Sequence, residues 1–176
     1  MHKFLEYTIL FVAMVLLQVF LFSRIGISMY VHPLVYIAFI LLLPMEIPGG
    51  WLLMLATLLG ISVDFFMGTA GINTISTLFV AFCRPTALLL LVGKDEVKDG
   101  GVPNVNRLGL KKFLRYAGVL IFLHSALFFM LETLSWRFFY VTLLRIVLST
   151  IVTLLLVYFC QRLFAVNRPG GYRSTE

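Results

Sequence analysis

Four ionisable side chains lie inside long apolar stretches of this 176-residue sequence: Asp64, Arg84, Glu132 and Arg145. A charged group in the hydrocarbon of a bilayer costs roughly 2.5–3.5 kcal/mol, so such residues pair with one another or mark an ion or ligand pathway. Two of the four are acidic and two are basic, so internal pairing would leave the interior neutral. We therefore interpret them first as assembly residues and second as a functional site.

Depth along the predicted helices favours particular pairs. Asp64 and Glu132 each lie near the end of an apolar run, and Arg145 lies seven residues into the last one. Seven residues correspond to about 10 Å at 1.5 Å per helical residue. Arg145 is therefore the better match for Asp64. A pair with Arg84 would require its guanidinium to extend along its flexible stem.

The sequence contains no clear motif of a catalytic or metal-binding site. His124 and Ser125 are adjacent, so on a helix they point in different directions and cannot form a nucleophile–base pair. The sequence contains no GxSxG and no HExxH, and its three histidines are dispersed. The two cysteines, Cys83 and Cys160, lie singly in apolar segments and form no CxxC. We expect no catalytic residue, no metal site and no cofactor.

The amino-acid composition indicates whether these residues lie in a soluble protein or in a membrane protein. Hydrophobic residues make up 61% of the chain and charged residues only 12%, whereas soluble domains contain about 25% charged residues. We predict a single all-α integral membrane domain over 1–176, a compact bundle of about six transmembrane helices. The second span is short and is expected to be tilted, re-entrant or only partly spanning. The predicted spans are 4–22, 33–45, 51–67, 73–92, 116–134 and 138–160.

Basic residues are distributed unevenly between the predicted loops. With the N-terminus inside, ten Lys and Arg residues fall on the inner side, and only Arg24 and Arg137 fall on the outer side. The inner set lies mainly in a polar loop at 93–115 and a tail at 162–176. By the positive-inside rule both termini are predicted to be cytoplasmic. The net charge of +6 therefore indicates contact with lipid headgroups, and we expect no nucleic-acid binding.

Small residues surround Asp64 at helical spacing. Ala56, Gly60, Asp64 and Gly68 follow one another at four-residue steps, which places them on one stripe of a helix. Small side chains let a second backbone come close, as membrane helices often require. We expect Gly60 and Gly68 to allow close packing around Asp64, and Gly68 and Gly71 to shape the turn that follows.

Polar residues also share faces on two other predicted helices. Pro85 lacks a backbone donor, so a kink is expected beside Arg84. The two faces are Asn73, Thr77, Ala81 and Arg84 on one helix, and Thr142, Arg145, Ser149 and Thr153 on the other.

An aromatic-rich strip over 124–140 lies at the predicted outer interface. Such residues anchor a bundle at headgroup level. They are also enriched at protein interfaces, so a docking surface for a partner is the alternative reading. The residues are Phe128, Phe129, Trp136, Phe138, Phe139 and Tyr140.

The segment "HPLVYIAFILLLP", a short link, and then "LLGISVDFFMGTAG" resemble the MreD family of bacterial membrane proteins. The shared pattern is an x-Pro start followed by G-x-x-x-D-x-x-x-G-x-x-G, and it covers residues 32 to 71. Size and hydropathy agree with the same family over the rest of the chain. The matching positions are Pro33, Gly60, Asp64, Gly68 and Gly71.

The resemblance implies a non-enzymatic scaffold of the cell-elongation (rod) complex in the bacterial inner membrane. Such proteins bind MreC, support the glycan polymerase RodA and its partner transpeptidase, and act indirectly on the MreB filament. The family also implies a fold related to the substrate-binding components of energy-coupling-factor transporters. The alternative function is therefore a vitamin- or metal-binding transporter subunit. Those subunits commonly carry an Ala-x-x-x-Ala stripe on the first helix, where this chain has Ala13 alone.

Overall fold

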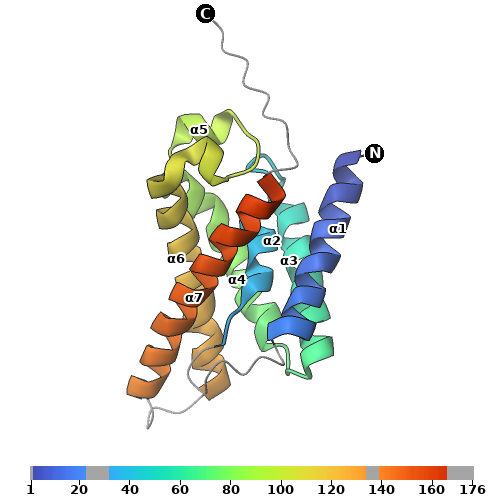
Figure 1. Cartoon of the computed structure of the whole chain (residues 1–176), viewed down its shortest axis with the longest axis vertical. Helices are drawn as coiled ribbons and strands as arrows, with labels where there is room; N and C mark the ends of the chain where they lie inside the picture. Colours follow the sequence, from blue (N-terminus) through green and yellow to red (C-terminus); the bar gives the residue numbers. More distant parts are fainter. Residues whose placement is uncertain (1, 23–31, 134–138, 166–176) are drawn as a thin grey trace, which may run out of the picture.

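The computed structural model describes residues 2–22, 32–133 and 139–165, and these residues are almost entirely helical, with no strand among them. Figure 1 shows the helices packed as a bundle. The elements, in chain order, are α1 (His2–Leu16), a π-helical turn η1 (Leu17–Phe22), a 3₁₀ turn η2 (Val35–Ile37), α2 (Ala38–Leu41), α3 (Gly49–Met67), α4 (Ile72–Ala87), a π-helical turn η3 (Leu88–Val92), α5 (Lys94–Lys98), α6 (Val105–Thr133) and α7 (Phe139–Ala165).

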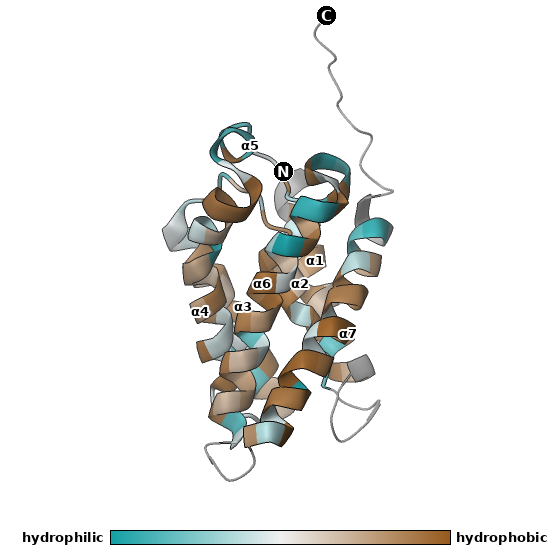
Figure 2. Cartoon of the chain, turned by 90° about the vertical axis from the view of Figure 1, so that its left-hand side faces the viewer, coloured by the Kyte–Doolittle hydropathy of each residue, from teal (hydrophilic) through white to brown (hydrophobic). Residues whose placement is uncertain are grey.

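Four of these helices are long and apolar enough to cross a bilayer, which agrees with the predicted membrane bundle. A fifth apolar helix, Leu5–Phe20, is shorter. Figure 2 shows apolar colour along the middle of the helices and hydrophilic colour around α5. The four long helices are Gly49–Met67, Ile72–Val92, Val105–Thr133 and Phe139–Arg162.

The bundle has two ends that differ in what they carry. In Figure 1, α1 begins, α5 lies and α7 ends at one end, which we name the α5 end. The α3–α4 turn, the end of α6 and the start of α7 lie at the other, which we name the turn end. The polar 93–104 region therefore lies at the same end as the first described residue of α1 and the last of α7.

A short apolar segment occupies the centre of the bundle. Every residue from Leu34 to Leu41 is at most 1% exposed. Its apolar character on all sides, which is typical of a fully buried element, explains this position. The prediction of a short helical span at 33–45 was only partly right, because only η2 and α2 are helical.

Other boundaries depart from the predictions at the α5 end. The expected loop at 93–115 contains α5 and the first turns of α6, which include a break at Gly109 (φ 75°, ψ 158°). α4 continues past Pro85 to Ala87 and then widens into the π-helical turn η3. A proline that removes one backbone donor is a usual cause of such irregularity.

Hydrogen bonds attach the polar loop to the rest of the α5 end. The amide of Met45 donates to the carbonyl of Gly101 (2.9 Å), and the amide of Gly101 donates to Oε1 of Glu46 (3.1 Å). Oε1 of Gln161, in the last turns of α7, accepts from the amide of Val105 (3.0 Å) at the start of α6. The loop therefore joins the end of the buried segment, α6 and α7.

α3 and α4 pack closely at Gly60. A Cβ atom built on Gly60 would lie 2.4 Å from the Cα and 3.0 Å from the backbone nitrogen of Thr74. Backbone atoms cannot move aside as a flexible side-chain tip can, so only glycine permits this approach. The predicted close packing at Gly60 is confirmed. A Cβ atom built on Gly68 would meet nothing within 4 Å, and the residue instead provides a positive φ of 66° at the end of α3, so its predicted packing role was wrong.

We expect Gly60→Ala to lower the free energy of unfolding by about 1–3 kcal/mol, the usual cost of overpacking. The reason is that the methyl group forces α3 and α4 apart. Thermal unfolding of the purified protein in detergent measures the change. Gly50→Ala is the matched control, because nothing lies within 4 Å of its Cβ position. Equal stability of the two variants would show that the contact is not tight.

Candidate functional site

The buried segment creates a requirement for hydrogen-bond partners inside the bundle. Backbone that is not helical leaves amide and carbonyl groups unpaired, and at membrane depth it is tolerated only where other protein groups satisfy it. Residues 32–34 and 42–44 are such backbone. Four buried polar side chains, those of Gln18, Arg84, Ser149 and Thr153, meet this requirement.

Gln18, in the π-helical turn after α1, holds the start of the segment. Its Nε2 donates to the carbonyl of Pro33 (3.0 Å), and its Oε1 accepts from the amide of Val35 (2.8 Å). Gln18 is fully buried. One amide side chain therefore replaces both partners that a neighbouring helical turn would have supplied. Gln18 was not among the predicted site residues, although a lone amide side chain within an apolar helix could have indicated it.

Two hydroxyl groups of α7 also accept hydrogen bonds from the backbone at the start of the segment. Oγ of Ser149 accepts from the amide of His32 (3.0 Å), and Oγ1 of Thr153 accepts from the amide of Leu34 (3.1 Å). Ser149 and Thr153 are fully buried, so the polar face predicted for this helix does point inward. Its function is to accept hydrogen bonds from the centre of the bundle.

Arg84 holds the other end of the segment. Its Nη2 donates to the carbonyl of Leu43, and both Nη atoms lie 3.4 Å from the carbonyl of Pro44. Its Nε donates to the hydroxyl of Tyr116 (3.0 Å), which in turn donates to the carbonyl of Leu41 (3.1 Å). Arg84 is only 1% exposed. Its positive charge is thus surrounded by carbonyl and hydroxyl dipoles.

Asp64 has a different role from the one predicted. Its Oδ1 accepts from Oγ1 of Thr69 (2.5 Å) and from the amide (3.1 Å) and Nδ2 (2.9 Å) of Asn73. Its Oδ2 accepts from the amide (2.8 Å) and Oγ1 (2.5 Å) of Thr74. The amides of Asn73 and Thr74 belong to the first turn of α4, where helical amides lack partners. Asp64 therefore caps α4 from the end of α3, where a negative charge also complements the helix dipole.

The predicted ion pairs of Asp64 were wrong. Neither Arg145 nor Arg84 contacts its carboxylate, which is satisfied by five donors of the α3–α4 turn. Two glycines allow that turn to fold back over the carboxylate. Gly68 and Gly71 both have positive φ angles, 66° and 86°, a region that other residues rarely adopt. The predicted turn at these glycines is confirmed.

A chain of hydrogen bonds continues from Asp64 into the bundle. Asn73, which donates to Asp64, accepts from the hydroxyl of Tyr36 (2.8 Å), and Nε2 of His124 lies 3.0 Å from the same hydroxyl. Tyr36 has a single hydroxyl hydrogen, so Nε2 of His124 is the donor. The Nδ1 of His124 has no partner among the described residues. His124 is fully buried, so it is a packed, hydrogen-bonded residue of the bundle.

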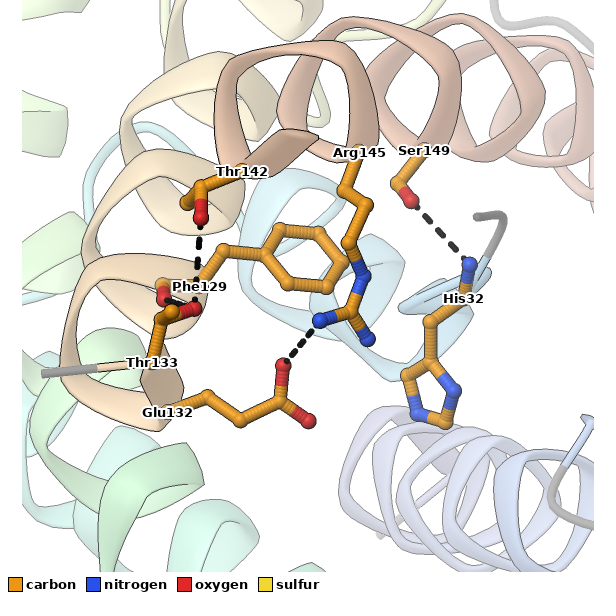
Figure 3. A network of polar contacts seen from close by, with 7 residues as sticks. All are labelled: His32, Phe129, Glu132, Thr133, Thr142, Arg145 and Ser149. Atoms are coloured by element: carbon orange, nitrogen blue, oxygen red, sulfur yellow. Dashed lines mark hydrogen bonds and ion pairs between the residues drawn. The ribbon is translucent and has the colours of Figure 1, made fainter. Parts of the chain in front are cut away.

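The remaining two intramembrane charges pair with each other at the turn end. Nη1 of Arg145 lies 3.1 Å from Oε2 of Glu132, and the guanidinium carbon lies 4.8 Å from the centre of the Phe129 ring. Figure 3 shows the guanidinium between the side chains of Glu132 and His32. The His32 ring stacks on Phe128, with centroids 6.0 Å apart and planes at 2°. We name Glu132, Arg145 and His32 the charged cluster.

The charged cluster is partly open to solvent. The side chain of Arg145 is 26% exposed and that of Glu132 is 40% exposed. The guanidinium of Arg145 and the carboxylate of Glu132 form the ion pair of this cluster.

The aromatic strip is divided between the core and the surface. Phe128 is 3% exposed and Phe129 is fully buried, so neither can anchor the bundle in headgroups or bind a partner. Phe139 and Tyr140 are exposed, at 46% and 86%. Trp136 and Phe138 lie outside the described residues. A partner surface in this region can therefore include Phe139 and Tyr140, while Phe128 and Phe129 belong to the core.

Within the described residues, no three His, Cys, Asp or Glu side chains come together as metal ligands. Comparison of the chain with family models, with curated proteins and with solved structures finds no match.

Proposed function

We propose that the chain is a non-enzymatic scaffold of the bacterial inner membrane that resembles MreD and binds an MreC-like partner beside the wall-synthesis machinery. One observation carries this proposal. The polar groups of Gln18, Arg84, Ser149 and Thr153 are directed at the backbone of the chain's own central segment. Interior polar groups used in this way stabilise one rigid bundle, and a rigid bundle is suited to holding a partner in place.

The motif behind the resemblance has a clear physical role in this bundle. Asp64, Gly60, Gly68 and Gly71 together close the junction of α3 and α4, and Pro33 opens the buried segment. We therefore interpret this motif as one that determines the fold of the bundle. The partner would then be bound by outward-facing surfaces, which are apolar on α3, α4 and α7.

The proposal includes six crossings, with both termini and the 93–104 loop in the cytoplasm. The concentration of basic residues at the α5 end supports this orientation. We expect a cysteine placed at the exposed Lys98, in a chain lacking Cys83 and Cys160, to be protected from an impermeant thiol reagent in intact spheroplasts. Labelling should appear once the membrane is permeabilised. Labelling of intact spheroplasts would reverse the orientation.

The function itself is tested by depletion and by purification. We expect depletion of the protein to round rod-shaped cells, because the elongation complex loses its support. An affinity-tagged copy should retain an MreC-like protein in mild detergent, with an unrelated tagged membrane protein as the control. Normal cell shape after depletion, together with no such partner, would contradict the proposal.

The second candidate is a substrate-binding subunit of an energy-coupling-factor transporter. The observation that favours it is the partly exposed charged cluster at the turn end. The same purification separates the two functions. Recovery of an ATPase and a coupling subunit in place of an MreC-like protein would establish the transporter role.

A further inference from the structure

One side of α6 passes from exposed basic residues to exposed apolar ones. Lys111 and Arg115 are exposed, and Val119 and Phe122 beyond them are 42% and 44% exposed. Steps of four, four and three residues place these side chains on the same side of a helix. The opposite side, which includes Leu120, is buried in the bundle. The four exposed residues therefore form one continuous surface, which we name the α6 outer face.

The basic pair lies at the depth of lipid headgroups. No Asp, Glu, Lys or Arg occurs in α6 between Arg115 and Glu132. Seventeen helical steps separate these two residues, or about 26 Å, which is close to the roughly 30 Å hydrocarbon thickness of a bilayer. Figure 1 shows that α6 begins at the α5 end. Lys111 and Arg115 therefore lie near the lipid headgroups at that end, with Val119 and Phe122 inside the hydrocarbon layer.

The charges of this basic pair are not neutralised by the bundle. Among the described residues, the salt bridges are those of Lys112 with Glu96 and of Arg145 with Glu132. Lys111 and Arg115 thus present two positive charges one helical turn apart to whatever lies beside α6. A lipid with a net negative charge complements them, whereas the trimethylammonium group of phosphatidylcholine cancels the charge of its own phosphate.

The apolar half of the α6 outer face favours a lipid over a soluble anion. Acyl chains that lie along Val119 and Phe122 remain in the hydrocarbon layer while the phosphate of the same molecule reaches the basic pair. Arginine can donate two parallel hydrogen bonds to a phosphate, and lysine adds a point charge beside it.

We infer that the α6 outer face binds an anionic phospholipid, with its phosphate on Lys111 and Arg115 and its acyl chains along Val119 and Phe122. One basic residue near an anionic membrane surface corresponds to about a fivefold change in affinity. The pair should therefore favour an anionic over a zwitterionic phospholipid by at least about fivefold. The inference does not depend on the scaffold proposed above.

Quenching of tryptophan fluorescence by brominated lipids tests the inference in bilayers. The full chain contains two tryptophans, so Val119→Trp in a chain with Trp51→Phe and Trp136→Phe places a single reporter beside the basic pair. A brominated acyl chain quenches only a tryptophan that it touches. In mixed bilayers, the quenching should give brominated phosphatidylglycerol a binding constant at least about fivefold higher than that of brominated phosphatidylcholine. Equal binding constants would overturn the inference.

Two double variants of this reporter chain locate the site. Lys111→Gln with Arg115→Gln should bring the ratio of the two binding constants close to one. Lys94→Gln with Lys98→Gln is the matched control, because it removes the same charge from exposed positions of α5 at the same end of the bundle, and it should leave the ratio unchanged. An unchanged ratio in the first variant, or an equal loss in both, would overturn the site. The comparison of the two lipids in the reporter chain decides the inference even if a double variant fails to fold.

A second reporter and a soluble anion complete the test. Leu58→Trp, with the same two Trp→Phe changes, places the tryptophan at a 51% exposed position of α3, a helix without Lys or Arg. Its ratio should be close to one, and a ratio equal to that at Val119 would overturn a site on α6. Inorganic phosphate should not displace brominated phosphatidylglycerol more than chloride does at the same ionic strength. Displacement by phosphate alone would show that the acyl chains contribute nothing and would overturn the lipid as the ligand.

Discussion

Arg84→Leu should be among the most destabilising substitutions in the chain, with a loss of about 2–5 kcal/mol of unfolding free energy. The substitution leaves the carbonyls of Leu43 and Pro44 and the hydroxyl of Tyr116 without their donor. Arg84 is 1% exposed, so water cannot replace it. Because these groups hold the end of the central segment, we expect local loss of packing at the α5 end as well as a lower Tm in detergent.

The controls separate the buried contacts of Arg84 from its charge. Arg115→Leu removes an exposed arginine from α6 and should change stability by no more than about 0.5 kcal/mol. Arg84→Lys keeps the charge but lacks the planar fork that reaches several acceptors, so its Tm should lie between those of Arg84→Leu and the parent. Equal stability of Arg84→Leu and Arg115→Leu would show that the carbonyl contacts contribute nothing.

The long helices could be predicted from the sequence because hydropathy alone identifies them. The spans expected at 51–67 and 73–92 correspond to Gly49–Met67 and Ile72–Val92 in the structure. The central segment could not be predicted in the same way. Its apolar run between Pro33 and Pro44 has no polar face, so periodicity cannot distinguish a short span from a segment that is buried on all sides.

The inward faces of the helices were predicted correctly, but the partners on them were not. Asn73, Thr77 and Arg84 are buried, as their shared face indicated. Ion pairs between the buried charges were predicted, whereas Arg84 donates to backbone carbonyls and Asp64 accepts from backbone amides and hydroxyls. Such partners leave no pattern of residue types, because every residue carries a carbonyl. The Glu132–Arg145 pair could have been predicted from the sequence, since both residues lie near the turn end of their helices.

Asp64→Ala should lower the unfolding free energy by about 3–5 kcal/mol, comparable to breaking a buried charged contact. Five donors lose their acceptor, and the first turn of α4 loses its cap. Asp64→Asn should lower the unfolding free energy by less than Asp64→Ala does, because the remaining carbonyl oxygen still accepts hydrogen bonds. It should not match the parent, because the new NH2 group cannot accept from the other donors. Asp99→Ala, at an exposed position, is the control and should be near neutral. Thermal unfolding in detergent and the amount of folded protein in the membrane measure these effects.

Double substitutions then test which partner Asp64 really has. The losses from Asp64→Ala and Arg145→Leu should add within about 0.3–0.5 kcal/mol, because the two side chains share no contact. Those from Asp64→Ala and Thr74→Val should add to less than their sum, because both remove the bond between Thr74 Oγ1 and Asp64 Oδ2. The opposite pattern, with coupling to Arg145 and none to Thr74, would show that Asp64 forms an ion pair with Arg145 and does not cap α4. Coupling to Thr74 alone would establish that a carboxylate in this membrane bundle serves to start the next helix.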